Sequence, residues 1–346
     1  MTQQLIIEQQ GRLGIIRLNR VESLNALSIE MIQGIHQQVL AWQHVPQVQA
    51  ILISSNSPKA FSAGGDVRYI YEGYHAGQQQ HLNYFADEYA MLNDLYASKK
   101  PILALLDGYV LGGGFGLAQA CHLRVSSEKS RFAMPETVIG YFPDVGATYF
   151  LSRLGEAGTY LALTGEQIGA SDALALGLIN AVVPHHDLAQ LEQRLIAAEV
   201  LDLPSIEDVI DQYAVSPQQG ELHSNLERIQ DYFAKSSVQQ IEQALANAPE
   251  QDRTWANTVA TSLAQRSPRA KRASFLLQQV GRTLSRQQAM SLERELQSLW
   301  FEVGDFVEGV RALIIDKDKQ PQWQDDQIDL EQQIETLLRE KLALSA

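Results

Sequence analysis

Residues 102–114 read ILALLDGYVLGGG, an apolar run that leads directly into a turn ending in three glycines. A short, continuous apolar run of this kind is typical of a buried parallel strand. Residues 50–66 repeat the arrangement, because the strand-like run AILIS is followed, after a short connection, by AFSAGGD. Two such units predict an α/β fold in which both glycine-rich turns follow the carboxyl ends of parallel strands.

The neighbouring segments alternate between strand and helix patterns. A hairpin is predicted where Gly11 separates two β-like runs, and Ser28 has the position of a helix N-cap. This alternation predicts parallel strands joined by right-handed crossovers. Besides the strands at residues 5–8, 13–18 and 50–54, the pattern predicts strands at 102–106, 123–125, 131–133 and 179–183, and helices at 84–97 and 113–121.

The composition changes near Val200. Beyond it, glutamine, glutamate and alanine dominate, and helical periodicity continues to Leu344. We therefore expect residues 1–200 to form the catalytic domain and residues 201–346 to form a helical region packed on it. The many glutamines of this region are typical of solvated helix faces.

Charge and cysteine content exclude several classes of protein. Lys and Arg number 27 and Asp and Glu number 41, so the formal net charge is −14. A nucleic-acid partner would require a basic face, so none is expected. The single cysteine, Cys121, cannot form an intrachain disulfide, and its apolar surroundings predict a buried, inert thiol. Neither a signal peptide nor a membrane-spanning segment is recognisable, and we expect a cytoplasmic protein with no membrane partner.

The two glycine-rich turns predict a cradle for a carbonyl oxygen. Glycines at strand ends let the backbone approach a ligand and point N–H groups at it. If each turn supplies one donor, the pair forms an oxyanion hole. The alternative is that the glycines only permit tight packing of strand against helix.

Other catalytic motifs are absent. The glycines at residues 112–116 do not have the G-x-G-x-x-G spacing, and neither a phosphate-binding loop nor a nucleophile elbow is present. The eight histidines show no metal-ligand spacing, so no metal site is predicted. The pair His185 and His186 is expected in a surface turn.

Residues 134–146, MPETVIGYFPDVG, carry two carboxylates, each directly after a proline. The apolar neighbours of Glu136 and Asp144 would raise a carboxyl pKa towards the range that suits acid–base catalysis. The alternative is that these acids cap helices. A third acid, Glu88, lies on a predicted helix, where a solvated face is the first expectation.

These segments together resemble the crotonase (enoyl-CoA hydratase/isomerase) superfamily. The resemblance rests on LNR at residues 18–20, LNAL at 24–27, the two glycine-rich turns and Pro135–Glu136. Residues 132–137 and 142–146, with DFVEGVRA at 305–312 and DKD at 316–318, closely resemble the 3-hydroxyisobutyryl-CoA hydrolase branch. The similarity spans nearly the whole chain and is loosest between about residues 200 and 280.

The resemblance implies a core of repeated ββα units that binds an acyl-CoA. It implies that the backbone N–H groups of Ala63 and Gly113 form the oxyanion hole. Glu136 matches the catalytic glutamate, Asp144 matches an additional acid of the hydrolase branch, and Glu88 matches an acid that contacts substrate there. Further substrate-binding positions are expected at Ala26, Gly64, Gly65, Asp66, Val67, Leu111, Gly112, Gly114 and Pro135.

One departure from the hydratases favours hydrolysis. Gly116 stands where hydratases carry their second catalytic glutamate, so a water held between two glutamates is not available. We therefore expect hydrolysis of 3-hydroxyisobutyryl-CoA, a reaction of valine catabolism, by a thioesterase that needs no metal or redox cofactor, since CoA is part of the substrate. The alternatives are an enoyl-CoA isomerase or hydratase reaction and a non-catalytic acyl-CoA-binding protein. The sequence leaves open whether the chain forms a homo-oligomer.

Overall fold

The computed structural model describes residues 3–77, 79–324 and 329–343. Contacts between Cα atoms divide the chain into two compact units. The first unit comprises Met1–Asp66, Tyr84–Ala133 and Ile168–His223, and the second comprises Val67–Asn83, Met134–Gln167 and Ser224–Ala346. This division does not coincide with the boundary expected at residue 200. A change of composition marks where a helical region begins, whereas a compact unit is defined by contacts between segments far apart in the sequence.

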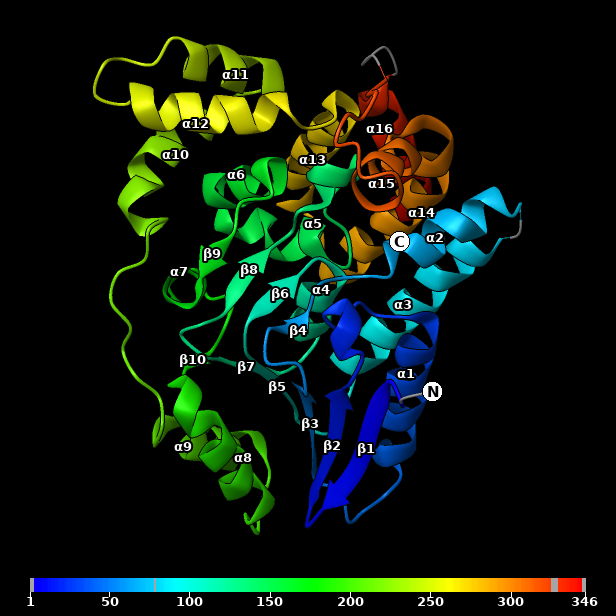
Figure 1. Ribbon diagram of the computed structural model, residues 1–346, viewed down its shortest axis with the longest axis vertical. Coiled ribbons are helices and arrows are strands. Elements are labelled where there is room, and N and C mark those ends of the chain that lie inside the picture. The colour runs from blue at the N-terminus through cyan, green and yellow to red at the C-terminus, as the bar shows by residue number, and fades with distance from the viewer. Residues whose placement is uncertain (1–2, 78, 325–328, 344–346) are drawn as a thin grey trace. The chain divides into compact units, whose positions relative to one another are not determined.

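Two sheets form the centre of the first unit (Figure 1). The larger sheet has the strand order β1-β2-β3-β5-β7-β10, and only its β1–β2 pair is antiparallel. The smaller sheet has the order β4-β6-β8-β9, with β8 and β9 antiparallel. The strands are β1 (Leu5–Gln10), β2 (Leu13–Leu18), β3 (Ala50–Ser55), β4 (Ala60–Ser62), β5 (Ile102–Leu106), β6 (Tyr109–Leu111), β7 (Leu123–Ser126), β8 (Arg131–Ala133), β9 (Ile168–Gly169) and β10 (Ala181–Val182).

The predicted α/β pattern is confirmed in most of its elements. Gly11 turns the β1–β2 hairpin with a φ of +58°. Ser28 caps α1 (Ile29–Gln43), and its side chain accepts a hydrogen bond from the Met31 N–H. The remaining helices that belong wholly or mainly to this unit are η1 (Val21–Ser23), α3 (Gln80–Tyr96), α4 (Gly113–Gln119), α7 (Ala170–Ala175), η4 (His185–Asp187), α8 (Leu188–Ile196) and α9 (Leu203–Asp211).

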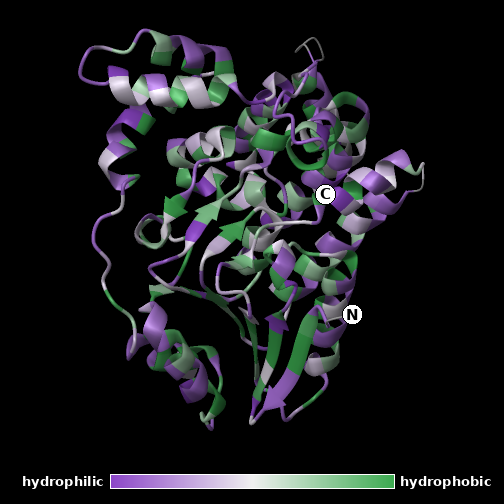
Figure 2. Ribbon diagram, viewed as in Figure 1, coloured by the Kyte–Doolittle hydropathy of each residue, from purple (hydrophilic) through white to green (hydrophobic). Residues whose placement is uncertain are grey.

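Every second residue of the strands contributes its side chain to the core of the first unit. Alternate residues on one face of the larger sheet, among them Ile15 and Leu52, are fully buried against apolar side chains of α8 and α9. On α8 these are Leu191 and Leu195, four residues apart and so on one side of the helix. In Figure 2 the strands are largely hydrophobic, while α8 and α9 alternate between hydrophilic and hydrophobic residues.

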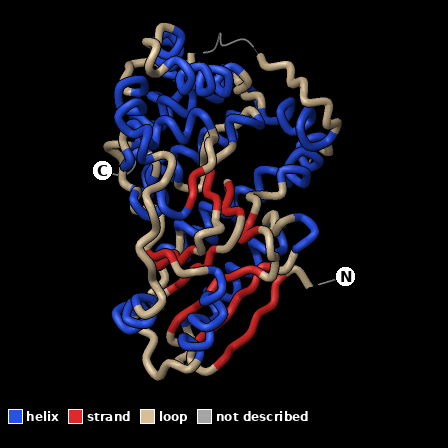
Figure 3. Tube along the Cα trace, turned by 60° about the vertical axis from the view of Figure 1, so that its left-hand side comes forward, coloured by secondary structure: helices blue, strands red, loops and turns tan. Residues whose placement is uncertain are grey.

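The described residues of the second unit form helices and loops, and the strands drawn red in Figure 3 belong to the first unit. The helical character predicted beyond residue 200 is confirmed as far as Ala343, and Leu344 lies outside the described residues. The elements are α2 (Val67–His75), η2 (Glu136–Ile139), α5 (Ala147–Phe150), η3 (Ser152–Leu154), α6 (Glu156–Thr164), α10 (Leu226–Phe233), α11 (Val238–Ala246), α12 (Arg253–Ala264), α13 (Pro268–Gly281), α14 (Arg286–Val303), α15 (Phe306–Val310), the π-helical turn η6 (Arg311–Ile315) and α16 (Leu330–Ala343); η5 (His223–Asn225) joins the two units along the chain.

Gly108 allows the chain to turn from β5 into β6, and it tests how much the fold depends on close backbone approach. Its φ is +74°, and a Cβ placed on it would lie 2.1 Å from the Lys59 carbonyl oxygen. We expect Gly108→Ala to lower the free energy of unfolding by roughly 3 kcal/mol or more, because both strain and a steric clash are introduced.

Gly177→Ala is the matched control, because Gly177 has a φ of +70° but no atom within 4 Å of an added Cβ. It should cost only about 1 kcal/mol, as expected for backbone strain alone. Urea denaturation of both variants gives the comparison, and equal losses would contradict the importance of the contact with Lys59.

Candidate active site

The two glycine-rich turns lie against each other in the first unit. The first turn follows β4 and the second follows β6, and these two strands pair in parallel. A Cβ placed on Gly113 would lie 3.2 Å from the Gly65 nitrogen, and one placed on Gly64 would lie 3.7 Å from the Gly113 nitrogen. The structure therefore brings the two predicted turns into one cradle.

The free N–H donors of this cradle belong to Gly65 and Gly113. The Ala63 N–H donates to the Leu24 carbonyl at 2.9 Å, so the prediction that Ala63 supplies an oxyanion donor is wrong for this structure. No hydrogen bond among the described residues uses the N–H of Gly65 or of Gly113. Gly113 is the first residue of α4, where a backbone N–H has no intrahelical acceptor. Leu24 lies in a separate loop, and nothing in the local sequence marks that its carbonyl accepts from Ala63.

A strained loop supports the first turn. Leu24 and Asn25 both have positive φ angles, 50° and 54°, which residues other than glycine adopt uncommonly. The Asn25 carbonyl accepts from Ser62 Oγ at 2.8 Å, and the Leu27 N–H donates to the Gly64 carbonyl at 2.8 Å. Ala26, predicted to contact substrate, is thereby held beside the first turn.

The other predicted residues of the two turns have structural contacts of their own. The Asp66 carboxylate forms an ion pair with Arg20 at 2.7 Å, so it is not available to a ligand in this state. The Gly112 N–H donates to the Ala133 carbonyl at 3.0 Å, and a Cβ on Gly114 would lie 2.5 Å from the Ser62 Cβ. Leu111, the last residue of β6, is half-buried.

Glu88 also lies at the cradle. Its side chain is only 2% exposed, so the expectation of a solvated helix face is wrong. A Cβ on Gly113 would lie 2.8 Å from Glu88 Oε1, and this oxygen has no hydrogen-bond partner among the described residues. Burial raises the pKa of Glu88 from its usual value near 4.5 to about 8. Glu88 is therefore an uncharged carboxylic acid at neutral pH, beside two free N–H donors.

The second unit carries the other two predicted acids. Glu136 opens η2 and Asp144 precedes α5, and their side chains are 8% and 5% exposed. Neither acid occupies an N-cap position, because the N-caps of η2 and α5 are Pro135 and Gly146. This disagrees with the capping alternative for both acids. Val67, also predicted to bind substrate, begins α2 of this unit.

One face of α14 holds the segment that carries these acids. Gln297 Nε2 donates to Asp144 Oδ2 at 2.8 Å, and Trp300 Nε1 donates to the Gly140 carbonyl at 3.0 Å. One turn before Gln297, the Glu293 carboxylate accepts from two backbone N–H groups. Residues 293, 297 and 300 are spaced so that they share one helix face. Glu293, Gln297 and Trp300 are at most 1% exposed, so the interpretation of the glutamines as solvated is wrong for Gln297.

The Glu293 carboxylate fixes a strained turn next to Asp144. It accepts from the Gly146 and Thr148 N–H groups, each at 2.8 Å. Val145 has a φ of +50°, and for a β-branched residue this conformation is a genuine outlier. Strain of this kind persists only where surrounding contacts over-determine it, and it clusters at functional sites.

The tail segment 305–312 packs against the Glu136 turn. A Cβ on Gly140 would lie 2.5 Å from the Asp305 carbonyl oxygen, and one on Gly309 would lie 2.2 Å from the Ile139 carbonyl oxygen. Ile139 ends η2, the turn that Glu136 begins. These contacts give a physical reason why the tail motif and the Glu136 motif occur in one chain.

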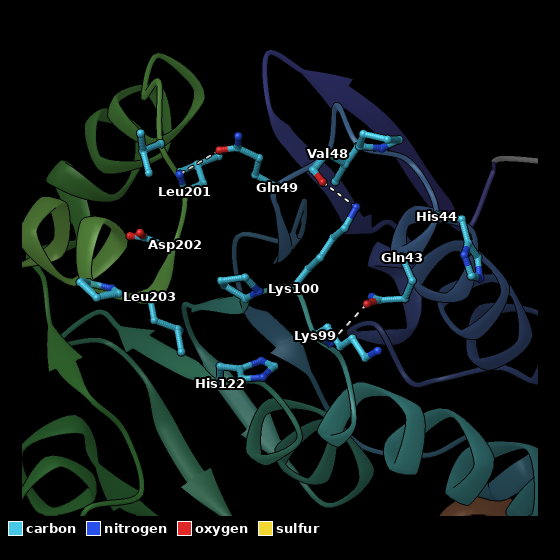
Figure 4. Close-up of a pocket in the computed structure, with 14 residues that line it drawn as sticks. Gln43, His44, Val48, Gln49, Lys99, Lys100, His122, Leu201, Asp202 and Leu203 are labelled. Atoms are coloured by element: carbon cyan, nitrogen blue, oxygen red, sulfur yellow. Dashed lines mark hydrogen bonds between the residues drawn. The ribbon is translucent and has the colours of Figure 1, made fainter.

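A cavity of about 680 Å³ lies elsewhere in the first unit (Figure 4). It borders residues that precede strands, such as Val48 before β3 and His122 before β7, and so lies at the amino ends of the strands rather than at the glycine-rich turns. Its polar groups are largely engaged: Lys100 donates to the Val48 carbonyl at 2.6 Å, and the Leu201 N–H donates to Gln49 Oε1 at 3.1 Å. The sequence did not single out this cavity.

Three further predictions bear on the chemistry. Cys121 is 3% exposed, and burial raises the pKa of its thiol to about 12, which confirms a buried, unreactive cysteine. In the described part of the chain, no group of three His, Cys, Asp or Glu side chains is arranged to hold a metal ion. Over the same residues, no helix is both long and apolar enough to cross a membrane.

A sequence model described as enoyl-CoA hydratase/isomerase matches residues 13–336. The chain belongs to this family. Among curated family members, the mitochondrial 3-hydroxyisobutyryl-CoA hydrolase of Gallus gallus is 40% identical over 326 residues, which cover 92% of this chain and 84% of that protein. The Homo sapiens protein of the same name is 34% identical over 327 residues, with 93% and 84% covered. The predicted branch of the family is confirmed.

Solved structures of the family share the fold. An enoyl-CoA hydratase from Rhodobacter sphaeroides superposes with a TM-score of 0.87 at 32% identity, covering 97% of each chain. A carnitinyl-CoA dehydratase from Mycobacterium thermoresistibile gives a TM-score of 0.88 at 27% identity, covering 97% of this chain and 96% of that one. The predicted crotonase-like α/β fold is confirmed.

The raised pKa of Glu88 predicts a pH-dependent stability. Between about pH 4.5 and 8 the folded protein holds a proton on Glu88 that the unfolded chain releases, so this residue's contribution to stability falls as pH rises through that window. We expect the unfolding free energy of wild type, minus that of Glu88→Gln, to decrease as pH rises. Urea denaturation from pH 5 to 8.5 measures this difference.

Glu207→Gln, on the exposed side of α9, is the control for a change of net charge alone. A difference between wild type and Glu88→Gln that stays constant from pH 5 to 8.5 would contradict a buried, protonated Glu88.

Proposed function

We propose that this protein hydrolyses 3-hydroxyisobutyryl-CoA to 3-hydroxyisobutyrate and CoA. The observation that carries the proposal is the pair of adjacent, unused N–H groups of Gly65 and Gly113. Such a pair fits an oxygen that becomes negative during attack on a thioester. The relatives named 3-hydroxyisobutyryl-CoA hydrolase support the choice of acyl group.

In the proposed mechanism, Gly65 and Gly113 donate to the thioester oxygen as the carbonyl carbon becomes tetrahedral. Loss of one such donor costs about 3–4 kcal/mol of transition-state stabilisation in other enzymes. A side chain at position 113 would crowd the site, because its Cβ would lie 2.8 Å from Glu88 Oε1 and 3.2 Å from the Gly65 nitrogen. The intermediate then collapses and expels the CoA thiolate.

The nucleophile is either Glu136 or a water molecule that Glu136 activates. In the first route, a Glu136 oxygen attacks the thioester carbon, CoA leaves as thiolate, and water then hydrolyses the mixed anhydride. In the second, Glu136 takes a proton from water as the water attacks. The burial of its side chain, which is 8% exposed, and the match of Glu136 to the family's catalytic glutamate support its participation.

Glu88 contributes by being uncharged. A carboxylate beside the cradle would repel the developing oxyanion, whereas a carboxylic acid does not and offers one O–H donor. The raised pKa of Glu88 fits this role at neutral pH. Asp144, the additional acid, orients either the substrate's 3-hydroxyl or the attacking water.

The broader setting is also part of the proposal. We place the reaction in valine degradation and in the cytoplasm. It needs no metal or redox cofactor, because a thioester is already activated towards attack. The names of the curated relatives describe those proteins as mitochondrial. A homo-oligomer is compatible with the proposal and is tested by sedimentation.

A second candidate function is hydration or isomerisation of an enoyl-CoA. The two similar solved structures named hydratase and dehydratase favour it. Gly116 disfavours hydration, because this buried position of α4 carries no carboxylate that could bind a water molecule together with Glu136. A non-catalytic acyl-CoA-binding protein is the third possibility, and tight CoA binding without turnover of any thioester would support it.

Thiol release from 3-hydroxyisobutyryl-CoA tests the main proposal. We expect Glu136→Gln to lower kcat by roughly 10²–10⁴-fold, because the amide is neither nucleophile nor base. The Glu207→Gln variant should retain wild-type activity, because that side chain is exposed on α9. If wild type releases no thiol, while trans-2- or trans-3-enoyl-CoA is consumed, the second candidate replaces the first.

Single-turnover hydrolysis in ¹⁸O-water separates the two routes. In the anhydride route, water attack at the Glu136 carbonyl leaves label in Glu136, which mass spectrometry of the peptide detects. Label confined to the free acid would favour direct attack by water.

A further inference from the structure

The Gln297 amide stands out among the groups around Asp144. Its side chain is 1% exposed, and its Nε2 donates to Asp144 Oδ2 at 2.8 Å. Its Oε1 is also buried and has no hydrogen-bond partner among the described residues. A buried acceptor without a partner is destabilising, so this oxygen is suited to accept from a donor that the described residues do not supply.

Chemistry fixes the orientation of this amide. The Gln297 nitrogen donates to an oxygen of Asp144, so the amide oxygen points away from that bond. The other polar groups on this face of α14 are already engaged, since Glu293 binds backbone N–H groups and Trp300 binds a carbonyl. The described side chains on this face of α14 therefore leave Oε1 without a donor, and a ligand can supply one.

A hydroxyl group is the ligand chemistry that fits. It provides a single O–H donor and is small and uncharged, as a buried site next to a carboxylate requires. Under the proposed function two hydroxyl sources arrive near Asp144, the substrate's 3-hydroxyl and the attacking water. Thr148 Oγ1, a hydroxyl of the same segment, is also buried without a partner among the described residues, so this region has further unused hydrogen-bonding capacity.

We propose that Gln297 determines specificity for 3-hydroxyacyl thioesters: its Oε1 accepts the hydrogen bond of the substrate's 3-hydroxyl, while its Nε2 positions Asp144. This inference rests on the proposed function. It also divides two roles that Asp144 would otherwise have to fill. Gln297 binds the substrate's 3-hydroxyl, and Asp144 orients the attacking water.

Gln278 on α13 provides a matched control. It is also 1% exposed, and both of its amide atoms lack partners among the described residues. What distinguishes Gln297 is its bond to Asp144. Gln297→Met and Gln278→Met thus remove the same buried amide from two helices of one unit, and thermal denaturation verifies that both variants fold.

Binding is measured by calorimetry in the Glu136→Gln background, so that the test does not depend on turnover. The probes are 3-hydroxyisobutyryl-CoA and isobutyryl-CoA, which differ only in the 3-hydroxyl. We expect the hydroxylated thioester to bind roughly tenfold more tightly in the parent and in Gln278→Met, and equally with isobutyryl-CoA in Gln297→Met. A preference that survives in Gln297→Met would overturn the inference.

Kinetics in the otherwise wild-type protein distinguish the two hydroxyl sources. If Gln297 binds the 3-hydroxyl, Gln297→Met lowers kcat/KM for 3-hydroxyisobutyryl-CoA more than for isobutyryl-CoA. An equal loss on both thioesters means that Oε1 serves the attacking water, and it contradicts the proposal. Absence of thiol release from wild type would reject the proposed function, while the binding ratio would still decide the role of Gln297.

Gln297→Glu tests the positioning role separately. It keeps an acceptor oxygen but places a second carboxyl group beside Asp144, and a like charge raises the pKa of its neighbour. We expect the preference for the 3-hydroxyl to remain while the acidic limb of the kcat profile moves to higher pH. An unshifted limb would show that Gln297 does not act on Asp144.

Discussion

The Glu293 carboxylate fixes the conformation of the turn that follows Asp144 in the second unit. A fully buried charge is costly unless it is hydrogen-bonded, and this one accepts from two backbone N–H groups, at Gly146 and Thr148. Those bonds fix the turn in which Val145 adopts a left-handed conformation. The same helix face then reaches Asp144 and Gly140 through its next two polar residues. One helix thus sets the position of an acid that lies about 150 residues earlier in the chain.

The first unit uses a different constraint, close approach of backbone. A Cβ on Gly113 would lie 3.2 Å from the Gly65 nitrogen, and among the described residues neither glycine N–H has an acceptor. Glu88 beside them is kept uncharged by burial, which raises its pKa. In one unit, then, a buried acid is useful because it is neutral. In the other unit, the buried Asp144 accepts one hydrogen bond from Gln297, and Glu293 fixes the turn that follows it.

The accuracy of the sequence predictions follows the range of the interactions that they involve. Strand alternation and the Ser28 cap depend on neighbours within a few residues, and both are confirmed. Glu136 and Asp144 are predicted as site residues because each stands in an apolar segment directly after a proline, and the structure shows that both are buried. Ala63 was the wrong donor, because its N–H is taken by Leu24, a residue in a separate loop. Glu88 was misjudged because helical periodicity does not reveal what packs against that side of the helix.

By itself, the sequence determined the α/β pattern, the two glycine-rich turns, the acids after the prolines and the missing glutamate at Gly116, because each of these is written in local composition and spacing. Only the tertiary structure decided that Gly65 rather than Ala63 keeps a free N–H. It also decided that glutamines of α14 are buried rather than solvated. The physical reason is that hydrogen-bond partners and burial depend on segments that lie far away in the chain and are brought together only by folding.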